Sequence, residues 1–312
     1  MTKRRTALTA LALLTTSGCS ASDGGPSLAK GNLQVFVVAE DSITKGLEPG
    51  TDIESVVDGW KVEYSRFLIA VGNFRAKTRG GAALADPTVY VLDMKNAPAG
   101  GYVTYDAKQV DAAEYDKVGE DMPSPTATAK LLAPTKPEDL AFMTSKGYSV
   151  YFEGTLSKGD GKSCKPGSKD PKDCVDAKTI RLRWGFAMGT SFDDCGKDAK
   201  AGFVVPAGGT VGVKPTIHGD HWFFTNITEG AEVTARRAQF IADADLDHNG
   251  ETTLDELKTV KAADAFPLDL YKLSGGIGGK IIATAYDYVE TQARTLHDYQ
   301  GDGECPTRTV LK

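Results

Sequence analysis

The feature that most constrains the fold is a run of apolar residues that changes parity within one strand. Residues 60–64 alternate apolar with charged side chains, whereas Phe67, Ile69 and Val71 alternate on the opposite parity. Alternation with a period of two is typical of a strand with one buried face. A strand that changes faces needs a bulge or a bend, often where it crosses between sheets.

The remaining pattern up to residue 228 also indicates short strands. We expect further strands at residues 33–38, 88–94, 101–106, 148–156, 179–186, 209–215 and 221–227, and one short helix at 138–145. Many short strands without alternating long helices are typical of an antiparallel β-sandwich, with a closed barrel as the alternative.

The periodicity changes after residue 226, and helices are expected at 231–242, 254–265 and 281–296. The predicted fold class is therefore mainly β with α. It consists of an antiparallel β-sandwich domain over residues 33–228, followed by a C-terminal helical EF-hand segment over residues 229–312.

The N-terminus has the features of an export signal. Basic residues at 3–5 precede a short apolar run, and small residues then lead to Cys19. The run is too short to span a bilayer. Residues 1–19 resemble the signal peptide of bacterial lipoproteins, in which the cysteine is lipidated; an ordinary cleaved signal is the alternative. Residues 20–32 are expected to form a flexible tether.

The resemblance to a lipoprotein signal predicts a protein of the cell envelope, exported and lipid-anchored at the outer membrane or in the periplasm. The membrane would then be a partner through the N-terminal anchor. The net charge of −6 and the lack of a basic stripe argue against nucleic acid as a partner.

Four cysteines remain after Cys19, an even number in a compartment that permits disulfides. They allow three connectivities, of which we favour Cys164–Cys174 and Cys195–Cys305. The alternative is a zinc site with four thiolates, but such sites usually have closely paired cysteines, and no such spacing occurs here.

Residues 245–256 match the EF-hand pattern D-x-[DN]-x-[DN]-G-x₅-E at every specified position. Ca²⁺ prefers oxygen ligands, and the glycine of the pattern permits the sharp turn that brings them together. The predicted ligands are Asp245, Asp247, Asn249, Glu251 through its carbonyl, Thr253 through water, and Glu256 as a bidentate carboxylate. An acidic turn without metal is the alternative.

Thr252 stands where paired EF-hands usually carry Ile, Val or Leu. We therefore expect a solitary structural site of low affinity, as in extracellular modules. Residues 298–304 repeat the first half of a calcium loop but lack its final glutamate. They are interpreted either as a degenerate second hand or as a polar C-terminal turn.

Two histidines flank Gly219-Asp220 just before an aromatic run. Because imidazole is a ligand for copper and zinc, His218, His221 and His297 form a candidate transition-metal site. Residues three apart face opposite sides of a regular strand, so His218 and His221 can both ligate only if Gly219 makes a turn. The alternative is two surface histidines at the start of a strand.

No motif of a serine hydrolase, a phosphate-binding loop or a zinc protease occurs, so no catalytic residue is assigned and an enzyme is not expected. The leading hypothesis is a calcium-binding, lipid-anchored envelope protein with a structural EF-hand site. Its role would be binding or scaffolding, with an unidentified protein or small-molecule partner. The alternative is a periplasmic copper- or zinc-binding protein that uses His218 and His221.

Residues 58–68, the His218-Gly219-Asp220-His221 motif and the EF-hand loop together resemble a group of uncharacterised secreted lipoproteins from myxobacteria and their relatives. The resemblance covers most of the mature chain. It implies no established activity, but it favours the metal-site hypothesis. That group has a longer histidine-bearing motif near the C-terminus, where this chain has residues 297–305.

Overall fold

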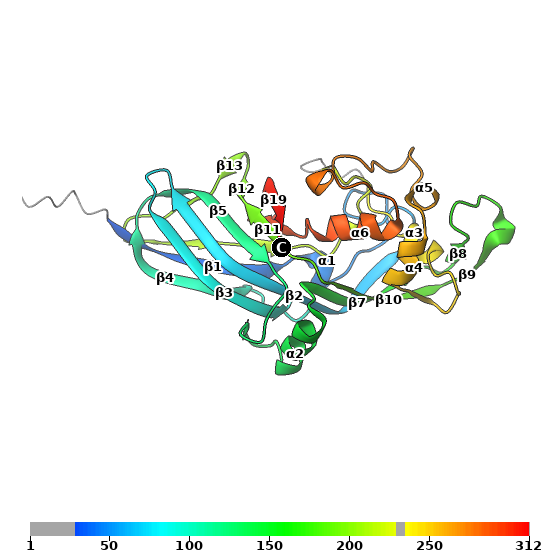
Figure 1. Ribbon diagram of the computed structural model, residues 1–312, viewed down its shortest axis with the longest axis horizontal. Coiled ribbons are helices and arrows are strands. Elements are labelled where there is room, and N and C mark those ends of the chain that lie inside the picture. Colours follow the sequence, from blue (N-terminus) through cyan, green and yellow to red (C-terminus); the bar gives the residue numbers. More distant parts are fainter. Residues whose placement is uncertain (1–28, 229–234, 312) are drawn as a thin grey trace, which may run out of the picture.

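The computed structural model describes residues 29–228 and 235–311 (Figure 1). The predicted export signal with Cys19, most of the predicted tether and the beginning of the helix expected at 231–242 lie outside the described residues. No helix within these ranges is both long and apolar enough to cross a membrane.

The smaller of the two main sheets has the strand order β15-β1-β16-β18, with β4 also paired to β1. The strands are β1 (Lys30–Ala39), β4 (Tyr102–Asp111), β15 (Thr210–Val213), β16 (Pro215–Ile217) and β18 (His297–Tyr299). Strand β1 runs parallel to β15 and β16 and antiparallel to β4, so this sheet is mixed.

The larger sheet has the order β17-β10-β7-β2-β5-β11-β19, with β3, β6 and β14 paired alongside. Its strands are β2 (Lys61–Thr78), β3 (Ala83–Asp93), β5 (Glu114–Met122), β6 (Lys130–Leu131), β7 (Val150–Ser157), β10 (Thr179–Phe186), β11 (Thr190–Asp193), β14 (Phe203–Val204), β17 (Glu251–Thr252) and β19 (Thr307–Val310). Two small hairpins stand apart, β8 (Lys162–Cys164) with β9 (Cys174–Asp176) and β12 (Gly196–Lys197) with β13 (Lys200–Ala201).

Strand β2 contains the expected change of parity. Its register against β7 shifts between Tyr64 and Arg66. Tyr64 is buried before the shift, and Phe67 and Ile69 are buried after it. The bulge inserts one residue and so keeps the apolar side chains on the core side. The prediction of a bulge or bend is confirmed.

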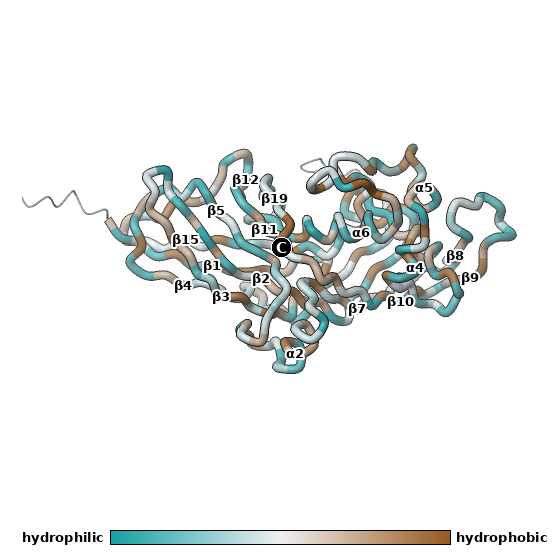
Figure 2. The backbone as a smooth tube through the Cα atoms, viewed as in Figure 1, coloured by the Kyte–Doolittle hydropathy of each residue, from teal (hydrophilic) through white to brown (hydrophobic). Residues whose placement is uncertain are grey.

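One hydrophobic core joins residues of both sheets, including Leu33 of β1 and Phe152 of β7. Its centre is aromatic, because Phe67, Phe152 and Trp222 stack with ring centroids 4.5–6.0 Å apart. Hydrophilic and hydrophobic stretches alternate along the strands (Figure 2). The mainly β fold is confirmed, but both sheets contain parallel pairs, so the fold is not purely antiparallel.

The helices are few and short. They are α1 (Asp41–Thr44), α2 (Pro137–Lys146), α3 (Gln239–Asp243), α4 (Leu254–Thr259), α5 (Ala262–Ala265) and α6 (Ala285–Ala293), with 3₁₀ turns η1 (Pro171–Asp173), η2 (His221–Phe223) and η3 (Ile277–Gly279). Helix α2 confirms the helix expected at 138–145. It starts with a proline and ends at Gly147, whose φ is 67°.

The expected C-terminal helical EF-hand segment is not found as such. The helix expected at 254–265 is interrupted because the backbone of Val260 is extended and Lys261 bridges to Thr284. The segment after residue 235 also supplies β17, β18 and β19 to the two main sheets. The helices α3 to α6 lie toward one end of the molecule, whereas α2 lies apart from them, at the bottom of this view near the middle of the molecule (Figure 1).

Both expected disulfides are present. Cys164–Cys174 closes the β8–β9 hairpin, and Cys195–Cys305 links the middle of the chain to its C-terminal part. These pairings confirm the favoured connectivity and leave no free thiol among the described residues for a four-thiolate zinc site.

Candidate metal centre

The chain turns within the motif that contains the two histidines. Strand β16 ends at Ile217, and η2 begins at His221. Gly219 lies at the turn, where an added Cβ would come within 2.7 Å of a side-chain carbon of Ile43. Its N–H donates to Ser42 Oγ at 2.9 Å, and its carbonyl accepts from the Tyr64 hydroxyl. The turn required for both histidines to face one site is therefore present.

His218 and His221 are both buried, and their ring centroids lie 5.0 Å apart. They are therefore not surface histidines. Together with Asp220 they form a group in which one ligand atom from each residue lies within 4.8 Å of the others. A zinc ion takes nitrogen and oxygen ligands at about 2.0–2.2 Å, so a small inward movement of the side chains would complete such a site. This group could hold a metal ion.

Carboxylates surround His218. Its Nδ1 lies 3.1 Å from Glu40 Oε2 and 4.0 Å from Asp220 Oδ1, and its Nε2 lies 3.5 Å from Asp298 Oδ2. Burial by itself lowers the pKa of His218, but the hydrogen bond with Glu40 and the charges of Asp298, Glu40 and Asp220 outweigh it and raise the pKa to about 10. The site therefore favours a positive charge at the position of this imidazole.

Asp220 is completely buried and has one unsatisfied oxygen. Its Oδ2 accepts from Arg236 Nε at 2.7 Å, whereas Oδ1 has no hydrogen-bond partner. Burial, followed by the charge of Glu40, raises the pKa of Asp220. A buried carboxylate oxygen without a partner costs about 1–3 kcal/mol or more. A cation bound beside Asp220 Oδ1 would remove that cost.

A hydrogen bond with Thr295 sets the tautomer of His221. The Thr295 hydroxyl donates to the Gln292 carbonyl at 2.8 Å and lies 2.7 Å from His221 Nδ1. A hydroxyl has one hydrogen to donate, so Nδ1–H of His221 is the donor to Thr295 and Nε2 keeps a free lone pair. Burial, and then the charge of His218, lowers the pKa of His221 well below its usual value, so the ring is neutral. A neutral imidazole oriented in this way is suited to ligate a metal ion.

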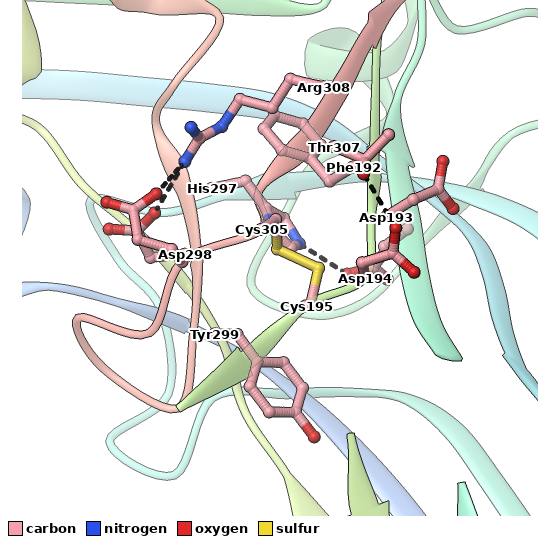
Figure 3. Close-up of a disulfide and its surroundings, with 12 residues drawn as sticks. Phe192, Asp193, Asp194, Cys195, His297, Asp298, Tyr299, Cys305, Thr307 and Arg308 are labelled. Carbon is pink, nitrogen blue, oxygen red and sulfur yellow. Dashed lines mark hydrogen bonds and ion pairs between the residues drawn. A yellow bond between two sulfur atoms is a disulfide. The ribbon is translucent and has the colours of Figure 1, made fainter. Parts of the chain in front are cut away.

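His297 does not join this group. Its Nε2 pairs with Glu120 Oε2 at 3.0 Å, and its Nδ1 lies 3.9 Å from Cys305 Sγ. Figure 3 shows His297 beside the Cys195–Cys305 disulfide. Successive side chains of a strand point to opposite faces, so in β18 it is the next residue, Asp298, that faces His218. The expectation that His297 is a third ligand is not supported, and the third member of the group is Asp220.

In the predicted calcium loop three carboxylates lie close together. Ligand atoms of Asp245, Asp247 and Glu256 lie within 4.8 Å of one another. Asp245 is held by the backbone N–H groups of Asn249 and Gly250 at 3.0 Å each. Gly250 has a φ of 77°, as the sharp turn of the pattern requires.

The other predicted calcium ligands are engaged within the loop. The Asn249 side chain donates to Asp247 and accepts from the N–H of Glu251, and Thr253 and Glu256 bond to each other in a capping box. The helices on either side have only five and six residues, so the long helix pair of an EF-hand is not found in the described residues. Calcium binding at this loop stays a prediction.

Residues 298–304 do not form a second hand. They comprise the end of β18 and a tight turn, with Tyr299 bridged to Gly303. Sequence reasoning also missed Glu40, Thr295 and Arg236, which surround the two histidines. Only Asp220 carried a signal, because it lies between the two histidines in the motif.

Fold and site together define a mainly β protein with a buried His–Asp–His group that could hold a metal ion. No protein-family model matches the chain, and no curated protein matches it. Among solved structures, MbnP from Methylosinus trichosporium is similar with a TM-score of 0.31 and 10% sequence identity, over 67% of this chain and 80% of that chain. A similarity at this level carries no argument about function, so the site is judged on its own geometry.

Proposed function

We propose that this protein binds one transition-metal ion, copper or zinc, through His218, Asp220 and His221. The observation that carries the proposal is the grouping of Asp220 with the two imidazoles, because the buried Oδ1 of Asp220 lacks a hydrogen-bond partner. Two imidazoles and a carboxylate suit copper and zinc better than calcium, which takes oxygen ligands. The bound ion would supply a fixed positive charge at the centre of the carboxylate cluster.

The surroundings of the three residues support the same proposal. Arg236 holds Asp220 by two contacts of 2.6–2.7 Å, and Thr295 orients His221. Partners of this kind fix the direction of ligand side chains in metal sites and raise affinity. With the export signal of the sequence, the proposal describes a metal-binding protein of the cell envelope.

Metal analysis of the purified full chain tests this function. We expect about one copper or zinc ion per chain after incubation with either metal and removal of the excess. The double variant His218→Ala/His221→Ala should lose this ion. His248→Ala is the matched control, because His248 is exposed and lies in a different loop. Metal retention by the double variant, or no stoichiometric metal in the wild type, would overturn the proposal.

A second proposal concerns residues 245–256, which we suggest bind Ca²⁺ as a structural ion. It is favoured by the convergence of Asp245, Asp247 and Glu256. The loop also continues into β17, which pairs with β10, so an ion there would stabilise the edge of the larger sheet. The two sites use different residues and are tested independently.

A further inference from the structure

His218 belongs to two groups of metal-ligand atoms at once. One is the buried group with Asp220 and His221. The other consists of Glu40, His218 and Asp302, in which one ligand atom from each residue again lies within 4.8 Å of the others. We infer that the second group is an outer station, which captures a divalent metal ion from solvent and passes it through His218 to the buried centre. This inference rests on the proposed function.

Exposure decreases along this series of ligands. Asp302 is exposed, the side chain of Glu40 is 27% exposed and that of His218 is 5% exposed, whereas that of Asp220 is 1% exposed. The inner centre is thus shielded from water, and a hydrated ion can reach His218 only after losing part of its water shell. Carboxylates at the surface would replace these waters one at a time before the ion enters.

The outer ligands are held in place by the fold. Glu40 follows directly after β1, and its Oε2 accepts from the Ser42 hydroxyl at 2.5 Å. Asp302 lies in the turn after β18, where Gly301 donates its N–H to Thr216 Oγ1 at 3.0 Å. The carbonyl of Gly301 also lies 3.4 Å from His218 Nε2. The turn that carries Asp302 is therefore fixed against both β16 and His218.

No hydrogen bond or ion pair within the described part of the chain explains the position of the Asp302 side chain. Its carboxylate makes no such contact with any other residue in the ranges 29–228 and 235–311. Its neighbours Asp298 and Glu304, by contrast, both contact Arg308. A free carboxylate at the entrance raises the local concentration of cations and the rate at which they associate.

Stopped-flow mixing of the full chain with Cu²⁺ alone tests the inference. Quenching of tryptophan fluorescence reports arrival at the inner centre, because buried Trp222 follows His221 directly in η2. We expect Asp302→Asn to slow association about tenfold while leaving the stoichiometry at one ion per chain. Glu40→Gln should slow it as well.

Asp198→Asn is the matched control, since Asp198 is exposed, lines the same surface hollow as Asp302 and gives the same change of net charge. It should associate within about twofold of the wild type. Equal association rates for Asp302→Asn and Asp198→Asn would overturn the inference. Faster dissociation with an unchanged association rate would also overturn it, because Asp302 would then be a ligand of the resting site.

The two proposals fail in different ways. If the wild type binds neither Cu²⁺ nor Zn²⁺, or if His221→Ala binds the metal equally well, the proposed function is wrong. If the wild type binds Cu²⁺ and His221→Ala does not, while Asp302→Asn and Asp198→Asn have equal association rates, only the inference of an outer station is wrong.

Discussion

The imidazole rings of His218 and His221 lie with their centroids 5.0 Å apart and their planes inclined by 40°. A regular strand would have placed these two residues on opposite faces. The turn at Gly219 brings them together, and it also buries Asp220 between them. The proposed metal centre therefore depends on the end of β16 and the beginning of η2 as much as on the histidines themselves.

Thr295→Val tests the orientation of His221. Valine has a similar shape but removes the acceptor for His221 Nδ1–H, so the ring loses its fixed tautomer. We expect affinity for copper or zinc to fall about 10- to 100-fold, measured by competition with a chelator of known affinity. Thr291→Val is the control, because Thr291 also donates to a helix carbonyl but does not contact a histidine. Equal affinities for the two variants would refute the role of Thr295.

Glu256→Gln tests the calcium loop. Glu256 belongs to the carboxylate group with Asp245 and Asp247, so the variant should lose the increase in thermal stability that Ca²⁺ produces in the wild type. Glu256 also accepts from the Leu246 N–H, so the variant should be somewhat less stable even without Ca²⁺. Asp255→Asn, at an exposed neighbour outside the group, should keep the full Ca²⁺ response. An unchanged response in Glu256→Gln would exclude the site.

Removal of the two disulfides should have unequal effects. Cys195 and Cys305 are 110 residues apart, whereas Cys164 and Cys174 are 10 residues apart. A longer closed loop restricts the unfolded chain more, so Cys195→Ser/Cys305→Ser should lower the free energy of unfolding by about 2 kcal/mol more than Cys164→Ser/Cys174→Ser. Urea denaturation of both double variants measures the difference. Equal losses would mean that the entropy of loop closure does not dominate the stabilisation by these two disulfides.

Acid should weaken the ion pairs of helix α6. Burial by itself raises the pKa of Glu290, but Lys280 and Arg294 outweigh it and lower the pKa below the ordinary value of 4.5. A lowered pKa contributes stability that is present above pH 4.5 and is lost as the pH falls through the pKa of the folded state. Glu290→Gln should therefore cost about 1–2 kcal/mol at pH 7, and the cost should shrink below pH 4.5.

Urea denaturation at pH 7, 5, 4 and 3.5 measures this dependence. Glu114→Gln serves as the control, since Glu114 is exposed and lies outside the helix. Its effect should be small at every pH. A cost for Glu290→Gln that stays constant down to pH 3.5 would contradict the expected role of the ion pairs.

Several elements could be predicted because their signals are local. The bulge in β2 follows from a change of apolar parity within a few residues, and helix α2 follows from the proline at its start. The C-terminal helices were harder to predict. The sequence favoured one helix over residues 254–265, but pairing of Lys261 with Thr284 interrupts it, so tertiary contacts override helix propensity there.

The sequence by itself determined the mainly β class and the two motifs whose side chains could ligate a metal ion, and it favoured the two disulfide pairs that the structure contains. Only the tertiary structure decided which residues act together. Glu40, Asp298 and Thr295 reach the histidines because β1, β16 and β18 pair side by side and α6 ends beside η2. The reason is physical: side-chain chemistry and periodicity are properties of neighbouring residues, whereas strand register is set by the packing of the whole core.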